Sequence, residues 1–308
     1  MALDADTLFT ESTAARLAAH FSDPLIGAVA GNAKVGNRVN LLTRWQALEY
    51  VTSQNLDRRA FESLNCITVV PGAVGAWRRS AVAAAGGFLS DTLAEDADLT
   101  MRMVRAGYRV VFEENAHAFT EAPQTVAAFT RQRFRWMFGT LQAGWKQRRI
   151  LLRPSGGLLG FVALPNVIVF QILFPLVSPI MDLTMLWTAM EACFNYFQHP
   201  AAGLSSGFWH TLYYYGVFLA IDFSTALFAY LFEPDEDWRL LPWLPLQRFS
   251  YRQLMYYVAI RSFIAALRGP HVGWGRLQRY GSVQTANAIN ETPPPPESEA
   301  PKQLARRA

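Results

Sequence analysis

Two groups of polar residues could do chemistry in this chain, and they lie 36 positions apart, from Asp96 to Gln132. Glu95 and Asp96 form an acidic pair near the start of a predicted helix. Gln132, Arg135 and Trp136 stand at i, i+3 and i+4, so on a helix they share one face. A carboxylate can take the proton of an attacking hydroxyl. An amide, a guanidinium and an indole together can bind a phosphate and stack on a sugar ring.

Each group also has a structural explanation, and both explanations stay open at this point. Acids in the first turn of a helix compensate its dipole, and the same position is expected to lower the pKa of Asp96 and keep it ionised at neutral pH. Arg and Trp are both common on helices that lie at an interface. Asp98, a third acid, is predicted to be structural.

Asp4 and Asp6 form a D-x-D triplet at the predicted end of a strand, where the chain enters a loop. Two alternate carboxylates in such a place can hold a divalent cation, which in turn neutralises a diphosphate. The triplet is common in surface loops, so it is a weak signal by itself.

The elements that would position these residues alternate between short strands and helices over residues 1–122, which is typical of an α/β domain. Hydrophobic periodicity and turn residues predict strands at 27–31, 66–70 and 109–112, the first ending in a Gly31-Asn32 turn. The same signals predict helices at 13–20, 39–61, 79–85 and 93–105, the last with Gly107 just after its end.

Residues 123–150 are predicted to form an amphipathic helix that carries the Gln132 to Trp136 group. Its charge comes from a set of basic side chains, namely Arg131, Arg133, Arg135, Lys146, Arg148 and Arg149. This composition is typical of a helix lying at a membrane surface, although an ordinary surface helix is the alternative.

Residues 151–280 are predicted to be transmembrane or interfacial helices. Only 17% of the chain is charged, against about 25% in an average protein, and residues 157–181 contain no Asp, Glu, Lys or Arg. Further apolar runs at 183–197, 207–232 and 253–267 give two to four crossings. Basic flanks on both sides favour an even number, by the positive-inside rule.

Two other features complete this region. Asp222 interrupts an apolar run and should face a cavity or a partner such as Arg261, or else lie at a membrane boundary. The Pro-rich residues 281–308 are predicted to be a disordered tail. The net charge of +4 is small and gives no nucleic-acid-binding face.

Taken together, the motifs resemble those of the membrane-bound, processive, inverting family 2 glycosyltransferases, which include cellulose, chitin, hyaluronan and poly-N-acetylglucosamine synthases. The resemblance runs from Asp4 to about Trp145. The family's Thr-Glu-Asp stands here as Ala94-Glu95-Asp96, its Gln-x-x-Arg-Trp is intact at Gln132 to Trp136, and residues 70–79 resemble its small-residue segment. The fold class that follows is α/β, a partial GT-A-like domain, followed by an α-helical transmembrane region.

The resemblance implies a role for each residue. Asp96 would be the general base, and Glu95 and Trp136 would contact the acceptor. Gln132 and Arg135 would bind the donor. Asp4 and Asp6 would also bind the donor and would hold Mg²⁺ or Mn²⁺. The reaction would move a sugar from a UDP-sugar to the hydroxyl of a growing β-linked polysaccharide.

The resemblance also implies a multi-pass protein of the cell inner (plasma) membrane, with its catalytic part in the cytoplasm. Partners would be the UDP-sugar, a polysaccharide or lipid-linked acceptor, membrane lipid and accessory synthase subunits. Two alternatives stay open: a non-processive membrane glycosyltransferase acting on a lipid acceptor, and a truncated, catalytically incompetent membrane component. The second arises because the family has nucleotide-binding strands ahead of its D-x-D, where this sequence has only Met1 to Leu3. A domain without those strands is expected to expose a sheet edge.

Overall fold

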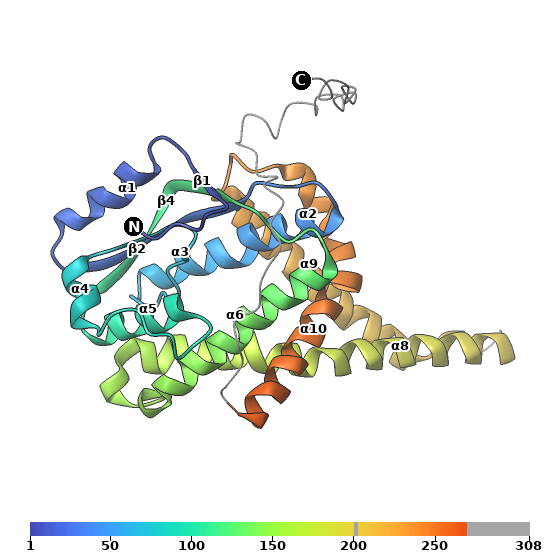
Figure 1. Ribbon diagram of the computed structural model, residues 1–308. Helices are drawn as coiled ribbons and strands as arrows, with labels where there is room; N and C mark the ends of the chain where they lie inside the picture. Colours follow the sequence, from blue (N-terminus) through green and yellow to red (C-terminus); the bar gives the residue numbers. More distant parts are fainter. Residues whose placement is uncertain (200–202, 270–308) are drawn as a thin grey trace, which may run out of the picture.

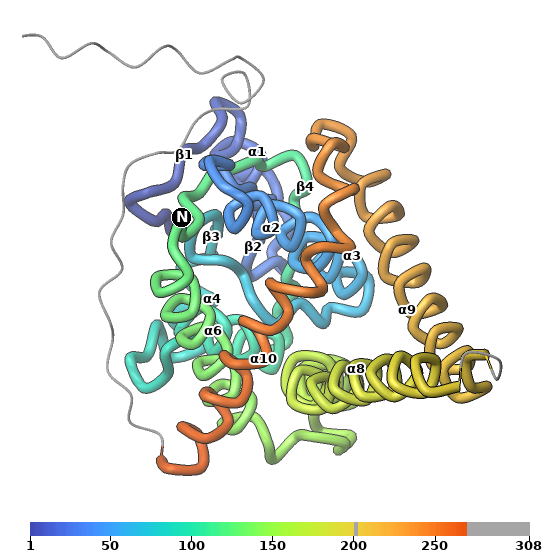
Figure 2. The backbone as a smooth tube through the Cα atoms, turned by 90° about the vertical axis from the view of Figure 1, so that its right-hand side faces the viewer, coloured from blue at the N-terminus to red at the C-terminus, as the bar shows by residue number. Residues whose placement is uncertain are grey.

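The computed structural model describes residues 1–199 and 203–269. The predicted tail at 281–308 lies outside the described residues. Figure 1 shows an α/β part from which α8 projects to one side, and Figure 2 shows α9 returning from the far end of α8 toward the α/β part.

A four-stranded sheet lies at the centre of the α/β part, in the order β1-β4-β2-β3. The two central strands, β2 (Ile26–Val35) and β4 (Arg109–Thr120), are parallel, whereas β1 (Thr7–Phe9) and β3 (Gly75–Trp77) pair antiparallel at the edges. All ten residues of β2 are buried, as expected for a central parallel strand covered on both faces.

Two of the strand predictions were wrong in detail. The expected turn at Gly31-Asn32 is a register shift within β2, which continues to Val35. Residues 66–70 form no strand, because Val70 donates its N–H to Thr100 Oγ1 at 3.0 Å instead of to a neighbouring strand. The edge of the sheet next to β2 is formed instead by the short strand β3, which the sequence analysis did not predict.

The helices of the α/β part agree closely with their predicted ranges. A capping box between Asn40 and Thr43 begins the longest of them, a run that continues through the π-helical η2 (Tyr50–Asn55). The remaining elements are α1 (Thr13–Ala19), η1 (His20–Ser22), α2 (Leu41–Glu49), α3 (Leu56–Glu62), α4 (Arg79–Ala84) and α5 (Glu95–Arg105).

Helix α6 (Val126–Gln147) connects this part to the apolar helices. Its first turn is capped by Thr125, whose hydroxyl accepts the N–H of Ala128 at 3.3 Å. The elements after it are η3 (Arg148–Ile150), η4 (Pro154–Gly156), η5 (Leu159–Ala163), α7 (Leu164–Asn166), η6 (Val167–Leu173), α8 (Phe174–Gln198), α9 (Ser206–Leu231), η8 (Trp238–Trp243) and α10 (Leu244–Arg268).

Within the described ranges, two helices are long and apolar enough to cross a membrane, namely Leu159–Gln198 and Ser206–Leu231. The runs at 157–181 and 183–197 therefore belong to one continuous helix. The run at 253–267 lies in α10, which packs against α6, α8 and α2.

Asp222 has a partner other than the one suggested by the sequence. Both its carboxylate oxygens accept hydrogen bonds from Arg252 of α10 at 2.9 Å, whereas Arg261 lies over the Phe134 ring of α6. A second carboxylate, that of Asp182 in α8, accepts from Arg248 of α10 at 3.3 Å. Basic residues of α10 thus pair with one acid of each apolar helix.

A buried ion cluster joins the sheet to the turn that follows α9. Lys34 of β2 lies 3.0 Å from Glu233 and 3.3 Å from Glu236, while Arg38 pairs with Glu236 at 2.5 Å and Arg59 with Glu233 at 3.1 Å. The side chains of Lys34 and of both glutamates are at most 5% exposed. Removing one partner from such a cluster leaves an uncompensated buried charge.

We therefore expect Lys34→Met to lower the free energy of unfolding by about 3–5 kcal/mol, the usual cost of breaking a buried ion pair. Chemical denaturation of the purified protein measures this change. The matched control is Asp23→Asn, which breaks an exposed pair with Arg109 at 3.8 Å and should cost less than about 1 kcal/mol. Equal losses in the two variants would contradict the buried cluster's structural role.

Candidate active site

The carboxylate of Asp96 is held between the start of α5 and the loop that precedes β3. Its Oδ1 accepts the N–H of Ala97 at 2.8 Å, and its Oδ2 accepts the N–H of Gly72 at 3.3 Å. One turn further along, Thr100 donates to the backbone carbonyl of Asp96 at 2.6 Å and accepts from Val70. These contacts fix the orientation of the carboxylate relative to residues 70–72.

The pKa of Asp96 is raised to about 6, whereas the sequence predicted a lowered one. Burial is the main cause and is reinforced by the negative charge of Glu95. The hydrogen bonds from Ala97 and Gly72 lower the pKa, but they do not offset burial. Asp96 is therefore a stronger base than a solvated aspartate and is still mostly ionised at neutral pH, which suits a general base.

Asp4 and Asp6 lie in the turn before β1, close to the same loop. Thr7 donates its N–H to the carbonyl of Asp4 at 3.1 Å, closing the turn, and Ala2 just ahead forms a β-bridge with Gly75. A Cβ placed on Gly72 would lie 3.8 Å from Asp4 Oδ1. Gly72 thus has Asp4 on one side and donates to Asp96, so the fold brings the D-x-D and the predicted base to one loop.

The carboxylate oxygens of these two aspartates are ligands of the kind that a hard divalent cation binds. Among the described residues, no group of three or more His, Cys, Asp or Glu side chains could hold a metal by itself. Mg²⁺ is commonly bound by one or two carboxylates together with substrate phosphates. Asp4 and Asp6 fit that mode, in which the ligand set is completed by a diphosphate.

The Gln132, Arg135 and Trp136 group lies in the middle of α6, and the structure adds Arg133 to it. The guanidinium of Arg133 lies 4.4 Å from the centre of the Trp136 ring and donates to Glu49 of α2 at 2.6 Å. Tyr251 of α10 also donates to Glu49. Arg133 therefore supports one face of the indole and connects α6 to α2 and α10.

The sequence analysis counted Arg133 among the basic residues that give the predicted amphipathic helix its charge, but Arg133 does not lie on the exposed side of α6, since it is only 3% exposed. Burial alone would lower the pKa of its guanidinium, but the adjacent Glu49 carboxylate offsets this and leaves the pKa raised. Arg133 is therefore a permanent buried cation. Of the three predicted residues, Gln132 is buried, whereas Arg135 and Trp136 are partly exposed.

Gly139 allows α6 to pass directly over the chain segment that leads into α5. A Cβ on Gly139 would lie 2.5 Å from the backbone nitrogen of Ala94 and 2.8 Å from the carbonyl carbon of Leu93. Just below, Gln142 accepts the N–H of Leu93 at 2.9 Å. The motif helix is thus fixed against the residues immediately before Glu95. No signal at 139 pointed to this role before the packing was known.

A second buried cation that the sequence did not single out is Arg58 of α3. It donates to Asn55 Oδ1 at 3.0 Å, and burial lowers the pKa of its guanidinium, while the charges of Tyr50, Asp57 and Asp96 act in the opposite direction. Arg58 therefore contributes positive potential on the Asp96 side of the domain.

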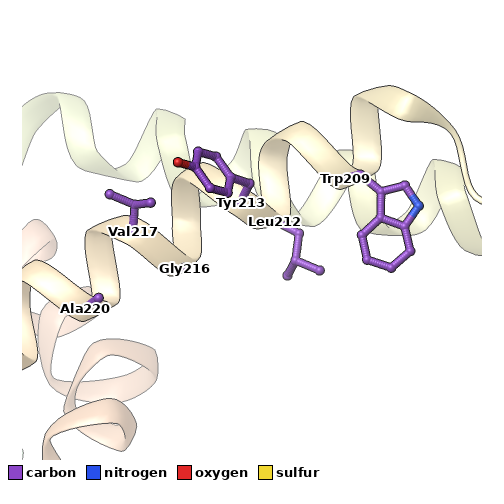
Figure 3. Close-up of a pocket in the computed structure, with 6 residues that line it drawn as sticks. All are labelled: Trp209, Leu212, Tyr213, Gly216, Val217 and Ala220. Carbon is purple, nitrogen blue, oxygen red and sulfur yellow. The ribbon is translucent and has the colours of Figure 1, made fainter.

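A shallow apolar hollow of about 420 Å³ lies far from this chemistry, along one face of α9 (Figure 3). It exists because two small residues leave a depression between larger side chains. Its lining is Trp209, Leu212, Tyr213, Gly216, Val217 and Ala220. Since it has no charged group, it cannot bind a nucleotide diphosphate, and the small residues instead are typical of helix packing in lipid.

Comparison with known proteins connects this geometry to a family. The profile of the family described as Glycosyl transferase family group 2 matches residues 1–266. The chain belongs to this family. Asp96, the D-x-D and the α6 group lie within the matched region.

The curated relatives match only part of this chain. Poly-beta-1,6-N-acetyl-D-glucosamine synthase of Staphylococcus aureus (strain COL) is 29% identical over 140 residues, which is 45% of this chain and 34% of the relative. The synthase of the same name from Staphylococcus epidermidis is 26% identical over 140 residues, again 45% of this chain and 34% of the relative. The chain thus spans about a third of the length of the curated relatives that it matches.

The fold is shared with a solved glycosyltransferase. The mannosyltransferase PcManGT from Pyrobaculum calidifontis, in complex with GDP-Man and Mn2+, has a TM-score of 0.50 and 17% sequence identity over 85% of this chain and 61% of that one. This likeness concerns the fold alone. It agrees with the GT-A-like α/β architecture expected from the sequence.

We expect Gly139→Ala to reduce the rate of glycosyl transfer by about tenfold or more, because the new methyl group must displace the backbone that orients Asp96, and small displacements of a catalytic group are costly. The rate is measured alongside the free energy of unfolding. The matched control is Gly144→Ala on the same helix, where a Cβ meets nothing within 4 Å and helix propensity should slightly stabilise the protein. An unaffected rate in Gly139→Ala would refute the positional constraint.

The pH dependence gives a second test of the site. A base must be deprotonated to act, so the transfer rate should fall as the pH drops through about 6, the pKa of Asp96. Glu95→Gln should move this midpoint to lower pH, because it removes a negative charge that raises the pKa. Asp91→Asn, which changes an exposed acid paired with Lys146, should leave the midpoint in place. A midpoint insensitive to Glu95 would contradict the assignment of the titration to Asp96.

Proposed function

We propose that this chain is an inverting glycosyltransferase that moves a sugar from a UDP-sugar to the hydroxyl of a growing β-linked polysaccharide at the membrane. The observation that carries the proposal is the arrangement around Gly72, where Asp96, with its raised pKa, and Asp4 meet at one loop while α6 is fixed against the start of α5. The similarity to poly-N-acetylglucosamine synthases supports a polysaccharide product.

In the proposed reaction Asp96 accepts the proton of the acceptor hydroxyl as the oxygen attacks the anomeric carbon. The bond between that carbon and the diphosphate breaks on the opposite face, so one displacement inverts the configuration. A single base on the acceptor side is sufficient for this chemistry. The hydrogen bonds from Ala97 and Gly72 hold the carboxylate in one orientation throughout.

Donor binding is assigned to Asp4, Asp6, Gln132 and Arg135. Asp4 and Asp6 would hold Mg²⁺ or Mn²⁺, which would neutralise the charge of the diphosphate when bound. The fold neighbour with GDP-Man and Mn2+ supports a divalent cation and a nucleotide-sugar donor. The guanidinium of Arg135 and the amide of Gln132 suit pyrophosphate oxygens.

Acceptor binding is assigned to Trp136, with Glu95 beside the base. An indole offers a flat apolar face to a sugar ring, and Arg133 fixes that indole from one side through its 4.4 Å contact. Because Arg133 is itself held by Glu49, the orientation of Trp136 depends on three helices, α2, α6 and α10.

The membrane location is supported by the two long apolar helices. Only 22% and 11% of their most apolar windows are buried within the protein, which is unlike the core helices of soluble proteins. Lipid would cover the exposed apolar faces of Leu159–Gln198 and Ser206–Leu231. If both cross the membrane, the two ends of the helical region lie on one side of it, and we assign that side, with the catalytic part, to the cytoplasm.

Incubating membranes that contain the protein with a panel of radiolabelled UDP-sugars, and measuring label in polymer and in lipid, tests the function. We expect polymer from one UDP-sugar. Asp96→Asn should reduce transfer by at least about 10²-fold, within the range for loss of a general base, while UDP binding persists. Label in lipid alone would favour single transfer to a lipid acceptor. Retained transfer in Asp96→Asn would exclude Asp96 as the base.

A further inference from the structure

The end of α6 and the segment that follows it up to the first apolar helix, residues 145–158, form a compact turn built around Ile150. A Cβ on Gly156 or on Gly160 would lie 2.6 Å or 2.3 Å from the carbonyl oxygen of Ile150, so both glycines are needed for the turn to close. Ile150 is buried in a cluster with Ala97 and Met101 of α5. This turn is therefore part of the same rigid unit as the helix that carries Asp96.

The outward side of the turn displays large apolar side chains. Trp145 is 69% exposed, Leu152 is 62% exposed and Leu158 is 50% exposed. Leu152 has a φ of 52°, in the left-handed region that non-glycine residues seldom adopt. Its N–H donates to Gly160 at 3.0 Å. The backbone thus holds a leucine outward in a conformation that it would not adopt by itself.

Arginines lie among these apolar side chains. Arg148, Arg149 and Arg153 are exposed, and none of them has an ion-pair partner among the described residues. Arg148 also lies over the Trp145 ring at 4.6 Å. No Asp or Glu occurs from residue 122 to residue 181, so nothing within this stretch neutralises the three cations.

We propose that the 145–158 turn docks on an anionic lipid leaflet, with Trp145, Leu152 and Leu158 entering the headgroup boundary and the three arginines binding lipid phosphates. Tryptophan and apolar side chains flanked by cations are the composition of an interfacial contact, and guanidinium groups pair with phosphate in a bidentate manner. The turn also leads directly into Leu159, where the first apolar helix begins. The inference rests on the membrane placement in the proposed function and adds a lipid selectivity to it.

Docking at this turn would fix the position of the active site relative to the bilayer. Gln147 accepts a hydrogen bond from Arg105, the last residue of α5, at 2.7 Å, and Ile150 packs on the same helix. Lipid contact at the turn is thereby transmitted to α5 through a side-chain hydrogen bond and an apolar cluster. Asp96, in the first turn of α5, would be held at a constant distance from the membrane surface.

The test is the quenching of Trp145 fluorescence by brominated lipids in nanodiscs that contain the purified chain. The contribution of Trp145 is the difference between the wild type and Trp145→Phe. We expect brominated phosphatidylglycerol to quench it about twofold more strongly than brominated phosphatidylcholine at equal bromine content, because anionic headgroups attract the basic turn. This preference should weaken in 0.5 M salt through screening and persist in millimolar inorganic phosphate.

The triple variant Arg148→Gln, Arg149→Gln, Arg153→Gln should lose the preference. The matched control changes three exposed arginines elsewhere, Arg16→Gln, Arg44→Gln and Arg239→Gln, and should keep it. Equal quenching by both lipids, or loss of the preference in phosphate, would overturn anionic-lipid docking, as would the absence of any quenching at Trp145. Trp187 and Trp209 lie on the two apolar helices, so failure to quench these would instead show that the membrane placement itself is wrong.

Discussion

The contact between Gly139 of α6 and the backbone at Leu93 and Ala94 is the constraint on which the rest of the site depends. Any side chain at position 139 would lie within 3 Å of that backbone, so the separation of the two helices is set by the absence of a Cβ. Helix α5, which carries Glu95 and Asp96, and the Gln132 to Trp136 group on α6 are thereby held in a fixed position relative to each other. A site of this kind is precise because two rigid helices carry it, and loops contribute only the short segments around Asp4 and Gly72.

Burial gives the charged groups of this site properties that solvated groups would lack. Asp96 has a raised pKa because it is removed from water, and Arg133 remains charged because Glu49 compensates its burial. In a medium of low dielectric, each interaction is stronger than it would be at the surface. Helix α10 contributes to this environment directly, since its Tyr251 donates to Glu49. A helix from the C-terminal half of the chain is thus part of the electrostatics of the site.

Much of the fold could be predicted from the sequence because its signals are local. Helices α5 and α6 follow from periodicity and α9 from its continuous apolar run, and Gly107 follows the end of α5 with a φ of 89°. The failures came from contacts between residues distant in the sequence. Residues 66–70 have strand-forming side chains because they are buried, not because they pair, and Arg133 meets a glutamate 84 residues away. The motif residues could be listed from the sequence, whereas the meeting of Asp4 and Asp96 at Gly72 could not.

The buried cluster of Lys34, Arg38 and Arg59 with Glu233 and Glu236 has a consequence for biosynthesis. Lys34 and its partner Glu233 are 199 residues apart, and a ribosome adding about 5–20 residues per second needs about 10–40 s to cover that interval. During this time the partners of Lys34 and Arg38 have not yet been made, whereas Arg59 can already pair with Glu114, so water must still reach that side of the sheet. The α/β part therefore completes its folding only after α9 and the turn that carries Glu233 have been synthesised.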